Sequence, residues 1–361
     1  MSLKEIWFII DVVFWVGFFV LDGFDFGVGI LQAFVPRNED ERRVYVNAIG
    51  PIWDGNEVWL IVAGAVIFAA FPAWYATMFS TFYLALLLVL VALMARGLSF
   101  EYRRKVDDER WRSTWRWGMA AGSAVVPLLL GVALGDQLHG LPIDKAGNYT
   151  GNFFGLLLPY GLWCGLTLLS LSLLSGATYL TLKTTGAVHD RIAARTRPIG
   201  AVAVLTVFGM LTWTHVGLGK GFLPNVLEVV AMLATIGAAM LAGPSDHEGW
   251  TFLTASIAMG ATVGSLFVEL YPNVMVSSTN HAYNLTVANT ASPQYTLTVM
   301  TVVAVIFFPV VLLYQGWSLN VFKKRLATPT DTGRGTRAAD RGAPPAVAEP
   351  AGTGEPRPSD P

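Results

Sequence analysis

The chain has 361 residues, of which 53 % are hydrophobic and only 14 % are charged, and its formal net charge is −1. Soluble proteins carry about 25 % charged residues, so a soluble globule of this composition would expose large apolar surfaces to water. The near-neutral charge argues against nucleic-acid binding, and the single cysteine, Cys164, excludes an internal disulfide or a multi-cysteine metal site.

Nine stretches of the chain are apolar and long enough to cross a bilayer as helices, which takes about 20 residues. In chain order they are residues 6–35, 50–71, 77–97, 117–136, 153–182, 198–217, 224–243, 250–272 and 296–322. The sequence therefore predicts an all-α polytopic membrane protein with nine transmembrane helices, in one transmembrane domain over residues 1–326.

The distribution of Lys and Arg predicts how these helices are oriented. The loops on one side hold 17 of these residues, whereas the other side holds only Lys4, Lys145 and Lys220. Cytoplasmic loops carry the excess of positive charge, so we expect the N-terminus outside and the C-terminus in the cytoplasm. Residues 327–361 are rich in Pro, Gly and Ala and cannot bury a core, which predicts a disordered cytoplasmic tail.

Four acidic residues and one arginine lie in or beside the first three predicted helices: Asp22, Asp25, Asp54, Glu57 and Arg96. An ionisable group in hydrocarbon costs roughly 2.5–3.5 kcal/mol on insertion scales, so each is a candidate functional residue. The i, i+3 spacing within each acidic pair places both carboxylates on one helix face. The predicted topology places the set toward the cytoplasmic side, with Asp22 nearer the midplane.

Carboxylates beside a guanidinium near the inner face predict a path by which protons enter. The alternatives are that these groups only tie helices together, that Asp54 contacts its helix dipole, and that Arg96 anchors a helix end. Four further acidic residues lie toward the outer ends of predicted helices, where we expect solvation at the membrane surface: Asp11, Asp136, Glu228 and Glu269. Glu228 and Glu269 stay candidates because their neighbours are apolar.

The histidines do not predict a haem site in this chain. A haem iron needs axial ligands such as His, Met or Cys. Four of the five histidines lie in predicted loops, and only His215 lies near a helix end. We therefore expect no haem ligand and no metal site here. In the first helix, Gly23, Gly27 and Gly29 predict close helix packing rather than a nucleotide loop.

Several stretches, taken together and in order, make the chain similar to subunit II of cytochrome bd-type quinol oxidase. The most specific are residues 22–29 (Asp-Gly-Phe-Asp-Phe-Gly-Val-Gly) and 53–60 (Trp-Asp-Gly-Asn-Glu-Val-Trp-Leu). Further matching stretches are Arg96 with residues 100–103, then residues 111–118, 149–154, 176–180, 277–279 and 294–301. The resemblance covers nearly the whole chain except its tail.

The resemblance implies two four-helix bundles plus a peripheral helix, in the bacterial plasma membrane. It implies a heterodimer in which subunit I carries haems b and d and the quinol-oxidising loop, so that this chain alone has no complete active site. The complex would oxidise quinol, reduce dioxygen to water in aerobic respiration, and be electrogenic without pumping protons. Some members hold a structural quinone in this subunit or bind small accessory subunits, and the sequence leaves both open here.

By the same resemblance, Asp25 and Asp54 match positions on a proton route, and Arg96 matches the basic residue beside the carboxylates. Trp59 matches a position near a route for oxygen from the lipid. From the residues alone, an ion-coupled secondary transporter is the alternative function, since it too has carboxylates inside a helix bundle. Such transporters favour paired broken helices around a midplane site, and this sequence shows no such pairing. A structural partner without any proton role is a third interpretation.

Overall fold

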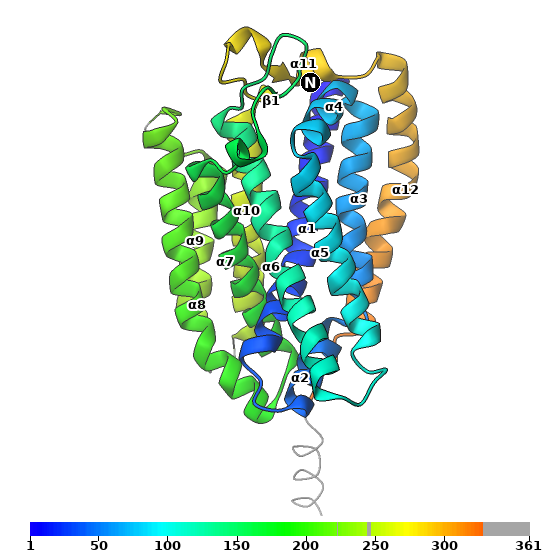
Figure 1. Ribbon diagram of the computed structural model, residues 1–361, viewed down its shortest axis with the longest axis vertical. Helices are drawn as coiled ribbons and strands as arrows, with labels where there is room; N and C mark the ends of the chain where they lie inside the picture. The colour runs from blue at the N-terminus through cyan, green and yellow to red at the C-terminus, as the bar shows by residue number, and fades with distance from the viewer. Residues whose placement is uncertain (222, 244–246, 328–361) are drawn as a thin grey trace, which may run out of the picture.

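The computed structural model describes residues 1–327 apart from 222 and 244–246, and within them the chain forms an upright bundle of helices (Figure 1). The predicted tail, 327–361, lies outside the described residues except for its first position. The long helices are α1 (Leu3–Phe34), α3 (Trp53–Ala70), α5 (Tyr83–Tyr102), α6 (Glu109–His139), α7 (Pro159–Lys183), α8 (Gly186–Thr212), α9 (Val226–Leu241), α10 (Glu248–Leu270) and α12 (Gln294–Val321).

Eight helices of the described chain are long and apolar enough to cross a membrane, and α9, with 16 residues, is a shorter apolar helix. The α8 span continues through a π-helical turn, η2 (Trp213–Gly217). The prediction of an all-α polytopic membrane protein is therefore confirmed. The count of nine spans and the division into two four-helix bundles with a peripheral helix stay predictions.

Short elements close the two ends of the bundle (Figure 1). At one end lies α2 (Glu39–Ile49), whose buried Val44, Tyr45 and Ile49 pack against the helices above it. At the other end lie α4 (Pro72–Thr81), η1 (Phe153–Leu156), η3 (His281–Tyr283), α11 (Val287–Thr290) and an antiparallel pair of strands, β1 (Asn273–Met275) and β2 (Leu285–Thr286). All of these elements are too short to cross a membrane.

Four predicted helix starts differ clearly from the observed ones: α6 begins at Glu109 instead of 117 and α8 at Gly186 instead of 198, and two others begin later than expected. The third span was expected to begin near residue 77, but α4 occupies that segment and α5 begins only at Tyr83. The fifth was expected from 153, yet α7 begins at Pro159, since proline is favoured in the first turn of a helix. Apolar composition continues across both breaks, so hydropathy alone does not locate them.

Helix α1 lies in the interior of the bundle, where it contacts α3, α6, α7 and α10, whereas only 6 % of the apolar stretch of α12 is buried. Gly27 of α1 faces Gly176 of α7 so closely that a Cβ atom on Gly27 would lie 2.8 Å from the Gly176 Cα atom. Any larger side chain would push the two backbones apart. The predicted role of the α1 glycines in close packing is therefore confirmed at Gly27.

Candidate functional site

The guanidinium of Arg96, on α5, joins three carboxylates from two other helices. Its Nη2 atom donates to Oδ1 of Asp22 at 2.9 Å and lies 4.0 Å from Oδ2 of Asp25, both on α1. Its Nη1 atom donates to Oε1 of Glu57 on α3. The side chains of Arg96, Asp22 and Asp25 are completely buried, and that of Glu57 is 19 % exposed. We call these four residues the Arg96 cluster.

Two amide side chains, missed by the sequence analysis, complete the cluster. Asn56 donates through Nδ2 to Oδ2 of Asp25 at 2.7 Å and to the Leu21 carbonyl at 3.1 Å. Gln315 of α12 donates through Nε2 to the side-chain oxygen Oδ1 of Asn56 at 2.8 Å, which holds the Asn56 amide in this orientation. Gln315 could have been noticed as a polar residue in an otherwise apolar predicted span. Asn56 lies within the stretch 53–60 but carries no charge to draw attention to it.

Asp54 does not join the cluster. It lies in the first turn of α3, is exposed, and forms no side-chain hydrogen bond or ion pair within the described chain. Asp54 and Glu57 do line the same hollow of about 420 Å³, together with Trp53 and Met94. The structure therefore places Asp54 at the surface and Glu57 between it and the buried carboxylates.

The interpretation of Arg96 as a helix-end anchor is wrong. Arg96 lies six residues before the end of α5, is completely buried, and its guanidinium carbon lies 4.7 Å from the ring centroid of Phe26. A basic residue that anchors a helix end reaches the polar surface of the membrane. Here the guanidinium instead points into the protein, toward the carboxylates of α1 and α3.

Trp59 lies on α3 and is nearly buried against α1. Its indole occupies the space beside Gly17, where a Cβ atom would overlap the ring. The Trp59 ring centroid lies 5.7 Å from that of Phe14, which in turn lies 5.4 Å from the ring of Phe308 on α12. Trp59 is thus part of an aromatic row that reaches from the interior toward the outermost helix.

The expected solvation of Asp11 and Asp136 is wrong. Both side chains have no exposure, and within the described residues none of their four carboxylate oxygens has a hydrogen-bond partner. The reason is that α1 and α6 are surrounded by other helices even near their ends, so a position near the predicted membrane surface can still be interior. Asp136 packs directly beside Gly161 of α7.

Glu228 and Glu269 are held by neighbouring polar groups. Glu228, 1 % exposed, lies at the start of α9, where the Asn225 amide N–H donates to its Oε2 atom at 2.8 Å. The same oxygen lies 2.8 Å from Nε2 of His215. Asn225 also donates through Nδ2 to Oε1 of Glu269 at 2.8 Å. These contacts join the ends of α8, α9 and α10, and Glu228 is buried rather than solvated.

Two histidines of the described chain are held by neighbouring polar groups. Both ring nitrogens of His215 are engaged, one by Glu228 and one by the Gly221 carbonyl oxygen. His189 lies between Asp190 and Glu248. The described residues bring no three His, Cys, Asp or Glu side chains together in a form that could hold a metal ion. The absence of a haem ligand from this chain stays a prediction.

The segments rich in Lys and Arg gather at the end of the bundle that carries α2. Arg103, after α5, donates to Glu39 of α2 at 2.5 Å, and Arg191 of α8 donates to Glu41 of α2. Arg325, after α12, donates to Glu248 at the start of α10. These ion pairs join segments that are far apart in the sequence at the same end of the bundle.

The sequence of the chain is similar to those of respiratory oxidase subunits. A family model described as cytochrome bd terminal oxidase subunit II matches residues 3–322. The cytochrome bd ubiquinol oxidase subunit 2 of Bacillus subtilis (strain 168) is 41 % identical over 330 residues, covering 90 % of this chain and 97 % of that protein. The cytochrome bd-I ubiquinol oxidase subunit 2 of Escherichia coli (strain K12) is 37 % identical over 352 residues, covering 87 % and 93 %.

A solved structure, that of bd oxidase from Geobacillus thermodenitrificans, has a similar fold. The match has a TM-score of 0.74, covers 90 % of this chain and 100 % of that chain, and has 16 % sequence identity. At this identity the likeness shows the fold alone.

Proposed function

The chain belongs to the family of subunit II of the cytochrome bd terminal oxidase, and from that premise we propose that it is the subunit without haem ligands of a quinol oxidase that reduces dioxygen to water. Its partner is a subunit I that carries the b- and d-type haems, which supply the electron transfer and oxygen chemistry. This chain supports the partner in the plasma membrane and conducts protons. The match over 87–90 % of the chain favours this function over an ion-coupled transporter.

The proposed orientation puts the α2 end in the cytoplasm and the N-terminus outside. It is supported by the many Lys and Arg residues of α2 and of the segments after α5, α7 and α12, since positive charge accumulates on the cytoplasmic side. Protons taken from the cytoplasm for water formation, with quinol protons released outside, make the complex electrogenic without a pump.

The proton path that we propose begins at Asp54, passes Glu57 and ends at Asp22 and Asp25. The observation that carries it is the arrangement of carboxylates around one buried guanidinium, with partly exposed Glu57 in the same hollow as Asp54. Arg96 balances the charge of one carboxylate, and the others can receive and pass on protons. The carboxylate oxygens Asp22 Oδ2 and Asp25 Oδ1, buried without a hydrogen-bond partner in the described chain, are free to do so.

Glu57→Gln tests this path most sharply. The Gln side-chain oxygen can still accept the hydrogen bond from Arg96, but it cannot carry a proton at neutral pH. In the assembled complex we expect oxygen reduction to slow about tenfold or more while haem absorption stays normal. Asp190→Asn, at the exposed start of α8, is the matched control and should retain the full rate. A normal rate in Glu57→Gln and Asp54→Asn, with normal haem content, would leave only the scaffolding role.

Trp59 is proposed to border a route for oxygen from the lipid. Supporting this, the aromatic row Trp59, Phe14 and Phe308 leads from α3 across α1 to α12, which has the smallest buried fraction of the spanning helices. Oxygen is apolar and partitions into such a path. Trp59→Phe, which leaves a smaller ring, should change the KM for oxygen with little change in kcat. An unchanged KM would contradict the route.

The face of α3, α5 and α12 is proposed to contact subunit I. The apolar stretches of α12, α5 and α3 are only 6 %, 22 % and 33 % buried. Asp54 and Gln315 add polar groups that contact with lipid alone would not favour. An apolar hollow of about 430 Å³ beside Trp15, Leu60 and Met78 is the place to look for a bound quinone or small accessory subunit, both of which stay predictions.

A further inference from the structure

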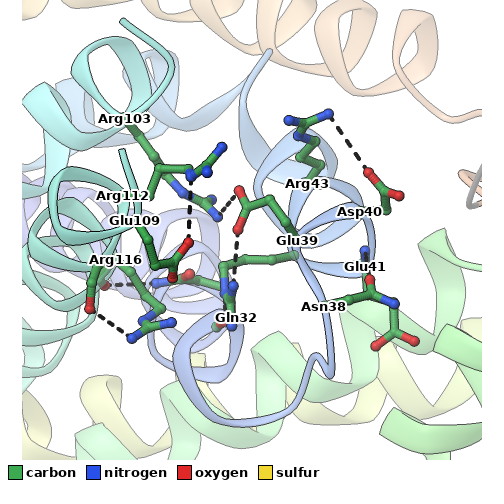
Figure 2. Close-up of polar contacts among 12 residues, drawn as sticks. Gln32, Asn38, Glu39, Asp40, Glu41, Arg43, Arg103, Glu109, Arg112 and Arg116 are labelled. Atoms are coloured by element: carbon green, nitrogen blue, oxygen red, sulfur yellow. Dashed lines mark hydrogen bonds and ion pairs between the residues drawn. The ribbon is translucent and has the colours of Figure 1, made fainter. Parts of the chain in front are cut away.

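A polar hollow of about 540 Å³ lies where α2 meets the loop between α5 and α6 (Figure 2). We call it the arginine hollow. Its charged lining consists of four arginines and two carboxylates: Arg43, Arg103, Arg104, Arg112, Glu39 and Asp107. It lies apart from the Arg96 cluster, and neither the proposed proton path nor the subunit contact uses it.

Ion pairs inside the arginine hollow neutralise only part of this charge. Arg103 donates to Glu39 at 2.5 Å and Arg112 donates to Asp107 at 2.7 Å, while Arg104 donates to the neutral side chain of Asn47 at 2.6 Å. Figure 2 shows Arg43 paired instead with Asp40, at 3.7 Å on the exposed side of α2. Arg112 also lies 3.6 Å from Glu109, so among the described residues Arg104 is the one arginine of this lining without a carboxylate partner.

The same arginines also keep unused hydrogen-bond donors. The Nε atoms of Arg103 and Arg112 are buried and form no hydrogen bond within the described residues, although Nε of Arg112 lies 3.6 Å from Oε2 of Glu109. A buried donor without a partner is unfavourable, so an acceptor that enters the hollow is favoured by hydrogen bonding as well as by charge. Planar guanidinium groups suit the oxygen pairs of a phosphate or carboxylate.

The surroundings place the arginine hollow at the level where lipid headgroups lie. Trp111 donates through Nε1 to the Tyr102 carbonyl at 2.8 Å, and these aromatic residues, like Trp115 nearby, are of the kind that gathers at membrane interfaces. The apolar part of the lining is formed by Val46, Phe100 and Val106, and Val106 is 46 % exposed. A lipid whose phosphate sits among the arginines can lay its acyl chains along this apolar face.

We propose that the arginine hollow binds the phosphate group of an anionic phospholipid from the adjacent leaflet. Arg43, Arg103, Arg104 and Arg112 hold the phosphate oxygens, and the acyl chains pack along α5. The inference rests on the hollow alone and does not depend on the proposed oxidase function. Free inorganic phosphate has the same recognition chemistry but lacks the acyl chains, so the test separates the two sources.

The test uses the full chain purified from its own membranes together with the subunits that accompany it. The complex is washed in mild detergent with phosphatidylcholine, then given phosphatidylglycerol, and the retained lipids are counted by native mass spectrometry. Arg112→Gln and Arg43→Gln are expected to retain phosphatidylglycerol about fivefold less than the wild type. Arg110→Gln, in the same first turn of α6 but exposed and outside the hollow, removes the same charge and should bind like the wild type.

A second measurement on the unaltered complex keeps the test decisive if a variant fails to assemble. Phosphatidylglycerol should raise Tm, whereas phosphatidylcholine and inorganic phosphate should not. Equal retention of phosphatidylglycerol by the Arg112→Gln, Arg43→Gln and Arg110→Gln variants would overturn the site. Stabilisation by inorganic phosphate alone, with displacement of phosphatidylglycerol, would overturn the lipid as its occupant.

Discussion

The Nη2 atom of Arg96 lies 2.9 Å from Oδ1 of Asp22, and both side chains are completely buried. This contact joins α5 to α1 at a point where water cannot solvate either charge. A buried ion pair as a whole adds little to the free energy of unfolding, because both charges lose their hydration. Removal of one partner is costly, because the other charge then stays buried without a counter-ion. We therefore expect the loss of either residue to destabilise the protein.

Arg96→Met should destabilise the protein by about 3–5 kcal/mol, because it leaves Asp22 as a completely buried charge without its counter-ion. The measurement is thermal unfolding of the purified protein in detergent. The double variant Arg96→Met with Asp22→Asn should recover part of the lost stability, since one stranded charge is removed. A double variant as unstable as the single one would show that packing of the Arg96 side chain, and not charge, was lost.

Gly27→Ala should destabilise the contact between α1 and α7 by about 1–3 kcal/mol. The new methyl group would meet the backbone of Ser172 and Gly176, which cannot move aside as a flexible side chain can. Gly237→Ala in α9 is the control, because its Cβ atom would meet only Thr254, at 4.0 Å. There, the better helix propensity of alanine should leave Tm unchanged or raise it. Thermal unfolding of both variants checks the difference, and an equal response would contradict it.

Glu41 should make the attachment of α2 sensitive to acid. Partial burial alone would raise its pKa, but hydrogen bonds from the Arg37 backbone N–H and from Arg191 outweigh this effect and lower the pKa from its ordinary value of 4.5. A carboxyl whose pKa is lowered by folding stabilises the folded state above its unfolded pKa, and this stability is lost as pH falls through the folded pKa.

The check is the difference in Tm between the wild type and Glu41→Gln, measured at several pH values. It should be constant at neutral pH and begin to shrink once the pH falls below 4.5, the ordinary pKa of the group. Hydrogen exchange of the α2 amides should increase over the same acidic range. A Tm difference that grows on acidification would refute the assignment.

Ile61→Trp should reduce assembly with a haem-carrying subunit if the α3–α5 face is the contact between subunits. Ile61 is 70 % exposed in this chain, and a packed protein contact has no room for the larger indole. Leu205→Trp on α8, at a position 63 % exposed, is the control, because fluid lipid accommodates a larger side chain. Haem content of the complex purified through this chain is the measurement. Equal haem content in the two variants would place the contact elsewhere.

The sequence alone was sufficient to identify the class of protein and its family. Apolar runs of spanning length predict membrane helices because the bilayer core must be crossed without exposed backbone polar groups, and this holds whatever the helices pack against. The same rule drew attention to Asp22, Asp25, Glu57 and Arg96 before any contact was known. Two of the boundaries that failed, near residues 77 and 153, lie where apolar composition continues through a break in the helix.

Which charged groups meet was decided only by the tertiary structure. Asp54 and Glu57 are three residues apart on one helix, yet Glu57 reaches Arg96 and Asp54 faces outward. Asp11 and Asp136 look like surface residues in the sequence but are interior. The physical reason is that hydropathy depends only on the type of residue. Burial and pairing depend on which neighbouring helix the side chain faces. These neighbours are determined only by how the helices pack against one another.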